Sequence, residues 1–250
     1  MIKVSIISLL FTAKILIDMF KRQFIAMLVC MMALGTMAQE GKFTVKGTFE
    51  GRKDSVTIAI RDVTNWETIA EETRAITGEM HELTFDLNDA ALLYVEDVRG
   101  LLTTVIPAIP GETVLFYQNG NKVTHLGGSQ FYVDYDEAQH YVEPLLLGIN
   151  ECNNAFSGKY GGLYPDELNL YSDLYFILNN RLIDYVNHYV KSYPDRDAAA
   201  ALIFLFAFDP NEIERTAAML TERARNSVAA NLYKAVNKWT VLRDVKGLAD

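Results

Sequence analysis

Short runs of alternating apolar and polar residues fill residues 42–126, and turn residues follow each run. The runs are KFTVKGTF (42–49), SVTIAIRD (55–62), 72–76, 81–87, ALLYVEDV (91–98), LLTTVIP (101–107) and TVLFYQ (113–118). A period of two is typical of strands with one buried face. Asn119-Gly120 adds a strong hairpin signal. Because no helical pattern separates these runs, residues 39–128 predict an antiparallel β-sandwich or barrel-like domain.

After Gly127-Gly128 the spacing of the apolar residues lengthens from two residues toward the three to four that are typical of a helix. Ser129 is the expected N-cap of a helix from Gln130 toward Asn150, and the glycines of residues 156–165 interrupt it. A second helix is predicted from one apolar stripe at Tyr171, Leu174, Leu178, Leu182, Tyr185 and Tyr189. Further helices are expected to start at Asp209-Pro210 and to run over 227–243. The sequence thus predicts an α+β fold in which an all-helical segment, residues 129–250, follows the β-rich domain.

The N-terminal segment has the order of a secretory signal peptide. Lys21 and Arg22 precede an apolar run over 24–34, and small residues stand at Thr36 and Ala38. We expect residues 1–38 to be removed between Ala38 and Gln39, which predicts an exported protein of the periplasm or cell envelope. The run is shorter than the ~20 residues that a spanning helix needs, so no stable membrane anchor is expected after cleavage.

Two other readings of this segment differ in how the chain is processed. A lipid anchor on Cys30 would need a small residue before the cysteine, and Val29 stands there. Residues 1–18 add a second apolar run in front of a complete signal. They are explained by a mis-assigned gene start at Met19 or by an extended leader.

Charge excludes some classes of partner. Residues 1–38 hold four of the 23 basic and one of the 32 acidic residues, so the remaining chain carries 19 basic and 31 acidic residues, a formal charge of −12. Nucleic acids and anionic membrane surfaces repel such a protein. We therefore expect no nucleic-acid partner.

Cys152 is the only thiol that remains after signal cleavage. A single cysteine forms neither an internal disulfide nor a CxxC redox pair, and no basic residue stands beside it to lower the pKa of its thiol. A structural cysteine is the main interpretation, and an intermolecular thiol is the alternative.

Other candidate chemistry is sparse. Asp136, His140 and Glu143 fall on one helical face, which fits a metal site or, more simply, a solvated acidic face. Ser157–Gly162 lacks the spacing of a phosphate loop and indicates an interhelical loop. The tyrosines of the second helix favour helix packing over a ligand platform. The sequence predicts no cofactor and no catalytic residue.

Several short motifs resemble one known family. The β-rich part carries FTVKGTF (43–49), TGE (77–79), IPGE (109–112) and GGS (127–129), and the helical part carries YVKSYP (189–194), DPNE (209–212) and ARNS (224–227). Together they look like the domain of unknown function that begins secreted thioredoxin-like (AhpC/TSA or TlpA-like) thiol-disulfide oxidoreductases of Bacteroidetes. The resemblance spans nearly all of residues 42–245. No position matches the CxxC of the thioredoxin domain that follows in that family.

Two hypotheses of function follow from these observations. The first is an exported, non-catalytic binding or scaffold module that holds an envelope protein. The second is the non-catalytic half of a split thiol-disulfide system that acts with a separate thioredoxin-like protein, with Cys152 as its possible intermolecular thiol. A truncated gene product without a role of its own is a third reading.

Overall fold

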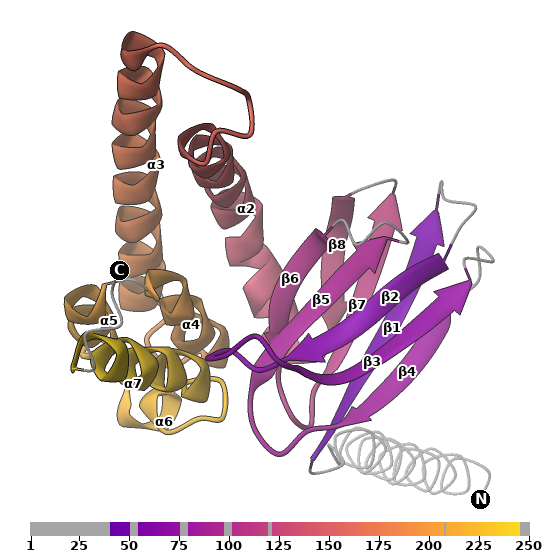
Figure 1. The fold of residues 1–250 in the computed structure, drawn as a ribbon. Helices are drawn as coiled ribbons and strands as arrows, with labels where there is room; N and C mark the ends of the chain where they lie inside the picture. The colour runs from indigo at the N-terminus through magenta and orange to yellow at the C-terminus, as the bar shows by residue number, and fades with distance from the viewer. Residues whose placement is uncertain are drawn as a thin grey trace, which may run out of the picture. The chain divides into compact units, whose positions relative to one another are not determined.

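The computed structural model describes residues 41–50, 55–75, 80–97, 102–119, 122–207 and 209–245. The predicted signal peptide, the Thr77-Gly78 turn and Gly120 lie outside the described residues. The described chain forms two four-stranded sheets followed by helices, which confirms the predicted α+β fold (Figure 1).

The strands form two layers, which we name sheet A and sheet B. Sheet A has the order β4-β1-β7-β8 and consists of β4 (His81–Asp86), β1 (Lys42–Glu50), β7 (Thr113–Asn119) and β8 (Lys122–Gly128). Sheet B has the order β3-β2-β5-β6 and consists of β3 (Thr68–Ala75), β2 (Ser55–Arg61), β5 (Ala91–Asp97) and β6 (Leu102–Ala108). Two separate sheets make this a sandwich, the first of the two predicted architectures.

The predicted period of two decides which side chains enter the sandwich. Phe43 and Val45 of β1 are buried and Thr44 between them is not, while Ile58 and Ile60 of β2 are buried in sheet B together with the small Ala59. β5 is different, because every residue from Ala91 to Val95 is buried. One face of β5 meets sheet A, and the other meets the helical part of the chain.

One strand pair departs from the antiparallel prediction. β1 pairs with β4 antiparallel on one side, but with β7 parallel on the other, with Thr44 opposite Thr113. Parallel neighbours need a long connection between them. Here all of sheet B lies in that connection, which a pattern of single strands does not reveal.

The helices begin directly after β8. They are α2 (Gln130–Phe156), α3 (Pro165–Ser192), α4 (Asp197–Leu202), a short 3₁₀ helix η1 (Ile203–Phe206), α5 (Pro210–Ala217), α6 (Glu222–Arg225) and α7 (Asn231–Val245). The predicted start at Asp209-Pro210 is confirmed, since the Asp209 carboxylate accepts a hydrogen bond from the N–H of Glu212. α2 extends past the predicted Asn150 to Phe156, and α7 begins four residues later than predicted.

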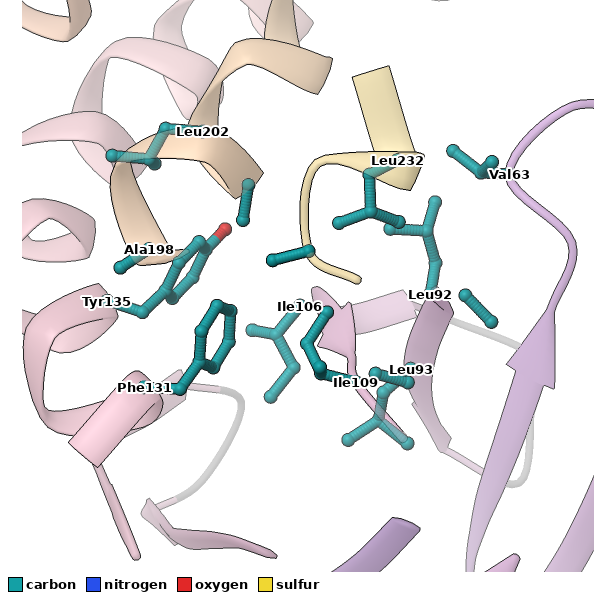
Figure 2. Close-up of a cluster of buried hydrophobic side chains, with 14 of the residues drawn as sticks. Val63, Leu92, Leu93, Ile106, Ile109, Phe131, Tyr135, Ala198, Leu202 and Leu232 are labelled. Carbon is teal, nitrogen blue, oxygen red and sulfur yellow. The ribbon is translucent and has the colours of Figure 1, made fainter. Parts of the chain in front are cut away.

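A single hydrophobic core runs from the sandwich into the helices. Figure 2 shows Ile106 and Ile109 from the sandwich next to Phe131 and Tyr135 of α2, with Leu202 of α4 above Tyr135 in this view. The Tyr132 hydroxyl, also buried, donates a hydrogen bond of 2.7 Å to the carbonyl of Pro107. The boundary predicted near residue 128 therefore marks a change of secondary structure inside a continuous core.

The junction between β8 and α2 is tight. Ser129 occupies the predicted N-cap position, but its side chain does not cap the helix. Its N–H and its hydroxyl instead donate to the carbonyl of Thr113 in β7, over 2.9 and 3.3 Å. Gly128, just before it, has a φ of +105°. These contacts fix the start of α2 to the edge of sheet A.

Candidate functional site

The α2–α3 hairpin extends away from the sheets and from the remaining helices (Figure 1). The first half of α2 packs on the core through Phe131, Tyr135 and Val142, and the second half of α3 does so through Leu182 and Val186. Over residues 143–181, which we name the distal half, only Cys152 and Ala155 are buried within the two helices. The two helices thus have a buried base and a distal half that packs mainly on itself.

Large apolar side chains are exposed on the distal half. Leu170, Leu174 and Ile177 follow one another at spacings of four and three residues, which places them on one face of α3. We name this set the outer stripe. Leu170 is 69% exposed and Ile177 is 53% exposed. Other exposed apolar residues of the distal half are Leu147, Phe156, Tyr160, Tyr164, Leu168 and Phe176. Large apolar side chains that are exposed on one face of a helix mark a candidate interaction site.

A separate stripe joins α3 to α2, as the sequence predicted for its tyrosines. The Tyr185 ring stacks on Tyr141 of α2, with ring centres 5.1 Å apart, and lies 6.4 Å from Tyr189. Of the predicted set, Leu182 and Tyr189 are buried, whereas Leu174 is exposed and belongs to the outer stripe. The residues of the single predicted stripe are therefore divided between two faces of α3. One face is buried, and the other is exposed to solvent.

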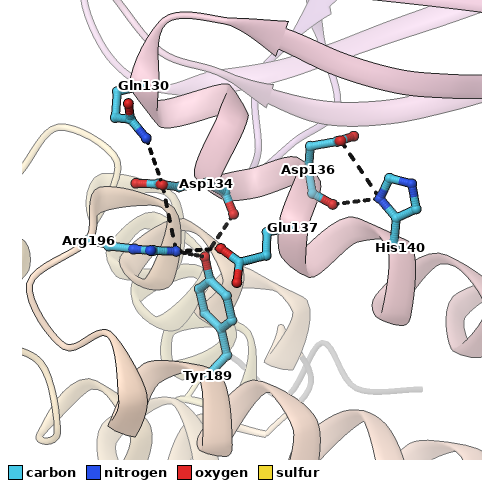
Figure 3. A network of polar contacts seen from close by, with 7 residues as sticks. All are labelled: Gln130, Asp134, Asp136, Glu137, His140, Tyr189 and Arg196. Atoms are coloured by element: carbon cyan, nitrogen blue, oxygen red, sulfur yellow. Dashed lines mark hydrogen bonds and ion pairs between the residues drawn. The ribbon is translucent and has the colours of Figure 1, made fainter.

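Arg196 holds the base of the hairpin together (Figure 3). Its guanidinium donates to Glu137 of α2 over 2.7 Å and to the hydroxyl of Tyr189 of α3 over 3.1 Å. It also lies 3.8 Å from the centre of the Tyr193 ring. Burial acts to lower the pKa of Arg196, but the hydrogen bonds to Glu137 and Tyr189 raise it above its ordinary value. The Tyr189 hydroxyl in turn donates to the carbonyl of Asp134 over 2.7 Å.

Asp136 is buried rather than solvated, so the interpretation of a solvated acidic face is wrong for this residue. Its carboxylate accepts a hydrogen bond of 2.8 Å from the N–H of Leu126, and lies 2.7 Å from Nδ1 of His125 in β8. His140 Nδ1 lies 2.8 Å from the backbone carbonyl of Asp136 (Figure 3). Because a carbonyl only accepts, that nitrogen of His140 carries the proton.

The predicted metal candidates are therefore only partly brought together. Asp136 and His140 are neighbours, with 3.8 Å between Nδ1 and the carboxylate, and His125 joins them from a strand that the sequence pattern did not connect to this helix. Glu143 is half-buried one turn further along α2. No group of three or more metal-binding side chains is found among the described residues. The carboxylate of Asp136 instead fastens β8 to α2.

Cys152 is free and fully buried in α2. Burial raises the pKa of its thiol above the ordinary value. A buried, protonated thiol is a poor nucleophile. The folded chain therefore does not present Cys152 to a partner, which argues against the intermolecular-thiol alternative and fits the structural interpretation.

The interhelical loop is also as predicted. The Ser157 hydroxyl donates to the carbonyl of Asn154, and Gly158 and Gly161 both have positive φ angles. After the loop, the Glu167 carboxylate accepts from the N–H of Tyr164 over 2.8 Å and so caps α3. The loop turns the chain from α2 into α3.

A polar contact connects α3 to α5 below the hairpin. The Glu212 carboxylate accepts hydrogen bonds from Asn187 over 2.7 Å and from Arg215 over 2.6 Å. Burial acts to raise the pKa of Glu212, but the bonds from Arg215 and Asn187 outweigh it and bring the pKa below its ordinary value. A carboxylate with a lowered pKa in the folded state stabilises the fold above its unfolded-state pKa and loses this contribution as the pH falls.

Replacing Glu212 with Gln is expected to lower the free energy of unfolding by about 1–2 kcal/mol at pH 7 and to remove part of the acid sensitivity. Below the ordinary pKa of Glu212, about 4.5, the stabilities of the variant and the parent should converge. Urea unfolding between pH 7 and pH 3 measures both effects. Glu214→Gln is the control, because Glu214 lies exposed on the same helix. A constant difference between E212Q and the parent over this pH range would contradict the assignment.

Comparison with known proteins assigns neither a family nor a relative. No protein-family model matches this sequence, and no curated protein matches it significantly. Within the described residues, none of the helices combines the length and the apolar character that crossing a membrane requires.

Proposed function

We propose that this protein is an exported, non-catalytic binding module and that the distal half of its α2–α3 hairpin holds a protein partner. The observation that carries the proposal is the outer stripe, Leu170, Leu174 and Ile177, which is apolar and exposed on a helix whose other face is already packed. Nothing in the folding of α3 itself explains three large apolar residues at this spacing. A partner that covers them does.

The base of the hairpin gives the distal half a fixed position. Arg196 connects α2 to α3 through Glu137 and Tyr189, and Glu212 connects α3 to α5 through Asn187. A surface that is fixed before binding loses less conformational entropy when a partner binds to it. This favours recognition by a preformed helix pair.

Charge indicates the chemistry of the partner. Asp166, Glu167 and Asp173 are exposed in the same first half of α3 as the outer stripe. A complementary partner surface is an apolar groove or helix with basic residues at its rim. The carboxylates of Asp166, Glu167 and Asp173 would repel an acidic partner or a second copy of this hairpin.

The resemblance to thioredoxin-like oxidoreductases supports a second identity for the partner, a separate thioredoxin-like protein of the same envelope. Since Cys152 is fully buried, such a contact would be non-covalent in the folded state. In that case the hairpin positions a redox protein without taking part in its chemistry.

A pair of isoleucines that are equally exposed provides the test. Ile177 in the outer stripe and Ile69 in β3 are both 53% exposed. Ile177→Asp and Leu170→Asp are expected to weaken capture of the partner at least tenfold, while Ile69→Asp retains it. Photo-crosslinking from position 176 in living cells, followed by mass spectrometry, identifies the partner. The free energy of unfolding of all three variants should stay within about 0.5 kcal/mol of the parent.

Equal capture by Ile177→Asp and Ile69→Asp would exclude the outer stripe as the docking surface. Crosslinking only to a second copy of this chain would replace the proposed partner with self-association. Capture of a thioredoxin-like protein would identify the split redox system, and capture of a different envelope protein would identify a scaffold.

A further inference from the structure

A pocket of about 240 Å³ lies between sheet B and the helical part, away from the distal half of the hairpin. The loop between β2 and β3 supplies one wall, Leu92 of β5 supplies the floor, and η1 and α7 supply the opposite wall. The residues from the loop are Val63, Thr64 and Trp66, and those from the helices include Leu205 and Val236. Figure 2 shows Val63 and Leu92 at this border between sheet and helices.

The walls of the pocket are apolar. Thr64 and the indole N–H of Trp66 are the polar side-chain groups among the residues that line it, and the Thr64 hydroxyl donates to the Asp62 carboxylate. A charged or strongly polar group placed in the pocket would lose its hydration without gaining a partner there. The part of a ligand that enters the pocket is therefore uncharged and apolar.

Trp66 stands at the pocket in a backbone conformation that bulky residues avoid. Its φ is +62°, in the left-handed region, and its side chain is 54% exposed. For a bulky residue this backbone conformation is strained. Folding gains little from it, because half of the indole remains in water. A strained and exposed tryptophan beside an apolar pocket points to a role in binding.

The loop is built to hold this conformation. The Asp62 carboxylate accepts hydrogen bonds from both the N–H and the hydroxyl of Thr64 and from the N–H of Asn65. The N–H of Trp66 donates to the carbonyl of Asp62 over 3.1 Å, and the N–H of Asp62 donates to the carbonyl of Glu67 over 2.9 Å. Burial acts to raise the pKa of Asp62, but the bonds from Thr64 and Asn65 bring it below its ordinary value. The carboxylate therefore stays ionised and the loop stays closed at neutral pH.

Aromatic and cationic groups continue from Trp66 over the outer face of sheet B. The Trp66 ring meets Tyr94 edge to face, with ring centres 6.0 Å apart. The Arg61 guanidinium lies 4.7 Å from the centre of the Tyr94 ring and forms a 2.7 Å ion pair with Glu96. These contacts support the Trp66 ring from the sheet side and leave its exposed part beside the pocket.

We propose that this pocket binds a small uncharged molecule through an aromatic ring, with Trp66 packing on the inserted ring. An apolar cavity of about 150 Å³ is large enough for benzene, so the larger pocket here has room for a substituted ring. Aromatic rings also prefer the edge and offset contacts that an exposed indole provides. The site is independent of the outer stripe, and its loss would leave the partner contact of the hairpin intact.

Fluorescence of Trp66 tests the proposal. The chain has two tryptophans, so Trp239→Phe leaves Trp66 as the only one. The probe is 4-bromobenzyl alcohol, whose bromine quenches indole emission on contact. Saturable quenching is expected, and the probe should also raise the melting temperature of the unmodified protein. As the aliphatic comparison, 6-bromo-1-hexanol is expected to bind at least tenfold more weakly.

Two variants separate the pocket from the rest of the surface. Ala207→Phe fills the pocket from the helical wall, and Leu205→Gln adds a polar group to the same wall. Each is expected to weaken probe binding at least tenfold. Val228→Phe is the control, because it also introduces a phenyl ring but at an exposed position that does not line the pocket. This variant should bind the probe as the parent does.

Three results would overturn the proposal. The first is quenching that rises linearly with probe concentration in the parent. The second is saturable binding that both Leu205→Gln and Ala207→Phe retain, which would place the probe elsewhere. The third is equal or tighter binding of 6-bromo-1-hexanol, which would exclude an aromatic ring as the preferred ligand group. Because none of these results involves the outer stripe, the proposed function of the hairpin is tested separately.

Discussion

Gly128→Ala is expected to lower the free energy of unfolding by about 3–5 kcal/mol, the largest effect of any single substitution considered for this chain. Two costs add at this position. Gly128 has a φ of +105°, which a residue with a Cβ atom rarely adopts. A Cβ atom built there would also overlap the carbonyl oxygen of Thr113, which belongs to the backbone, so the clash cannot be relieved by a side-chain rotation.

The same carbonyl of Thr113 accepts the N–H of Ser129. If the backbone shifts to relieve the clash, the hydrogen bond from Ser129 to Thr113 at the start of α2 is weakened. The pairing of β7 with β8 is weakened as well. We expect both the sandwich and the base of the hairpin to be destabilised, since they share one core. Urea unfolding, followed by far-ultraviolet circular dichroism, measures the loss of stability.

The adjacent glycine is the matched control. A Cβ atom on Gly127 would lie 4.0 Å from Leu115 Cβ, which is an ordinary contact, and its φ is not in the left-handed region. Gly127→Ala should change stability by less than about 0.5 kcal/mol. Similar losses in the two variants would mean that the general properties of glycine, and not this clash, decide the stability of the junction.

Arg196→Ala is expected to cost about 2–3 kcal/mol, which is the second-largest effect. The guanidinium donates hydrogen bonds to Glu137 and to the Tyr189 hydroxyl, while its Cζ lies over the Tyr193 ring, 3.8 Å from the ring centre. The side chain is about a third exposed, so the ion pairs alone contribute less than their distances imply. Most of the loss should come from the contact with the Tyr193 ring and from the hydroxyl of the buried Tyr189.

Arg196→Lys should recover less than half of this loss, because an ammonium group cannot both stack on Tyr193 and reach two acceptors. Arg223→Ala is the control for an exposed arginine. Its ion pairs with Asp195 and Asp197 are solvent-exposed, so its loss should cost less than about 1 kcal/mol. Hydrogen exchange of the alanine variant should rise at the base of α2 and α3. Full recovery by lysine would show that charge alone matters at this position.

Local patterns were enough to predict most secondary structure in this chain. The period of two in KFTVKGTF (42–49) and SVTIAIRD (55–62) predicts β1 and β2 almost to their ends, and Asp209-Pro210 places the start of α5 at the correct residue. These signals are local. Successive side chains of a strand point alternately to the core and to solvent, so apolar and polar residues alternate in its sequence. The parallel pairing of β1 with β7 is not local, and no residue in either strand encodes it alone.

The surroundings of the candidate site residues could not be predicted for a related reason. Asp136 and His140 are neighbours on one helix and could be grouped from their spacing, whereas His125 comes from β8 and is brought to Asp136 by the junction. Leu174 was assigned to the packed stripe, since spacing alone does not separate a packed face from an adjacent open face. Trp66 lies in a loop, and its positive φ depends on a set of hydrogen bonds around Asp62 that no propensity predicts. The loop sequence Asp62-Val63-Thr64-Asn65-Trp66, rich in turn-forming side chains, was the available signal.

The parallel contact between β1 and β7 also sets an order of assembly for the sandwich. The strands of sheet B pair only with antiparallel neighbours, and all of them are synthesised before β7. β1, in contrast, is an inner strand of sheet A that keeps one side unpaired until Thr113–Asn119 has been synthesised. Closing so long a loop slows folding. Sheet B is thus the part of the chain that can form first, and the first strand of the domain is among the last to be enclosed.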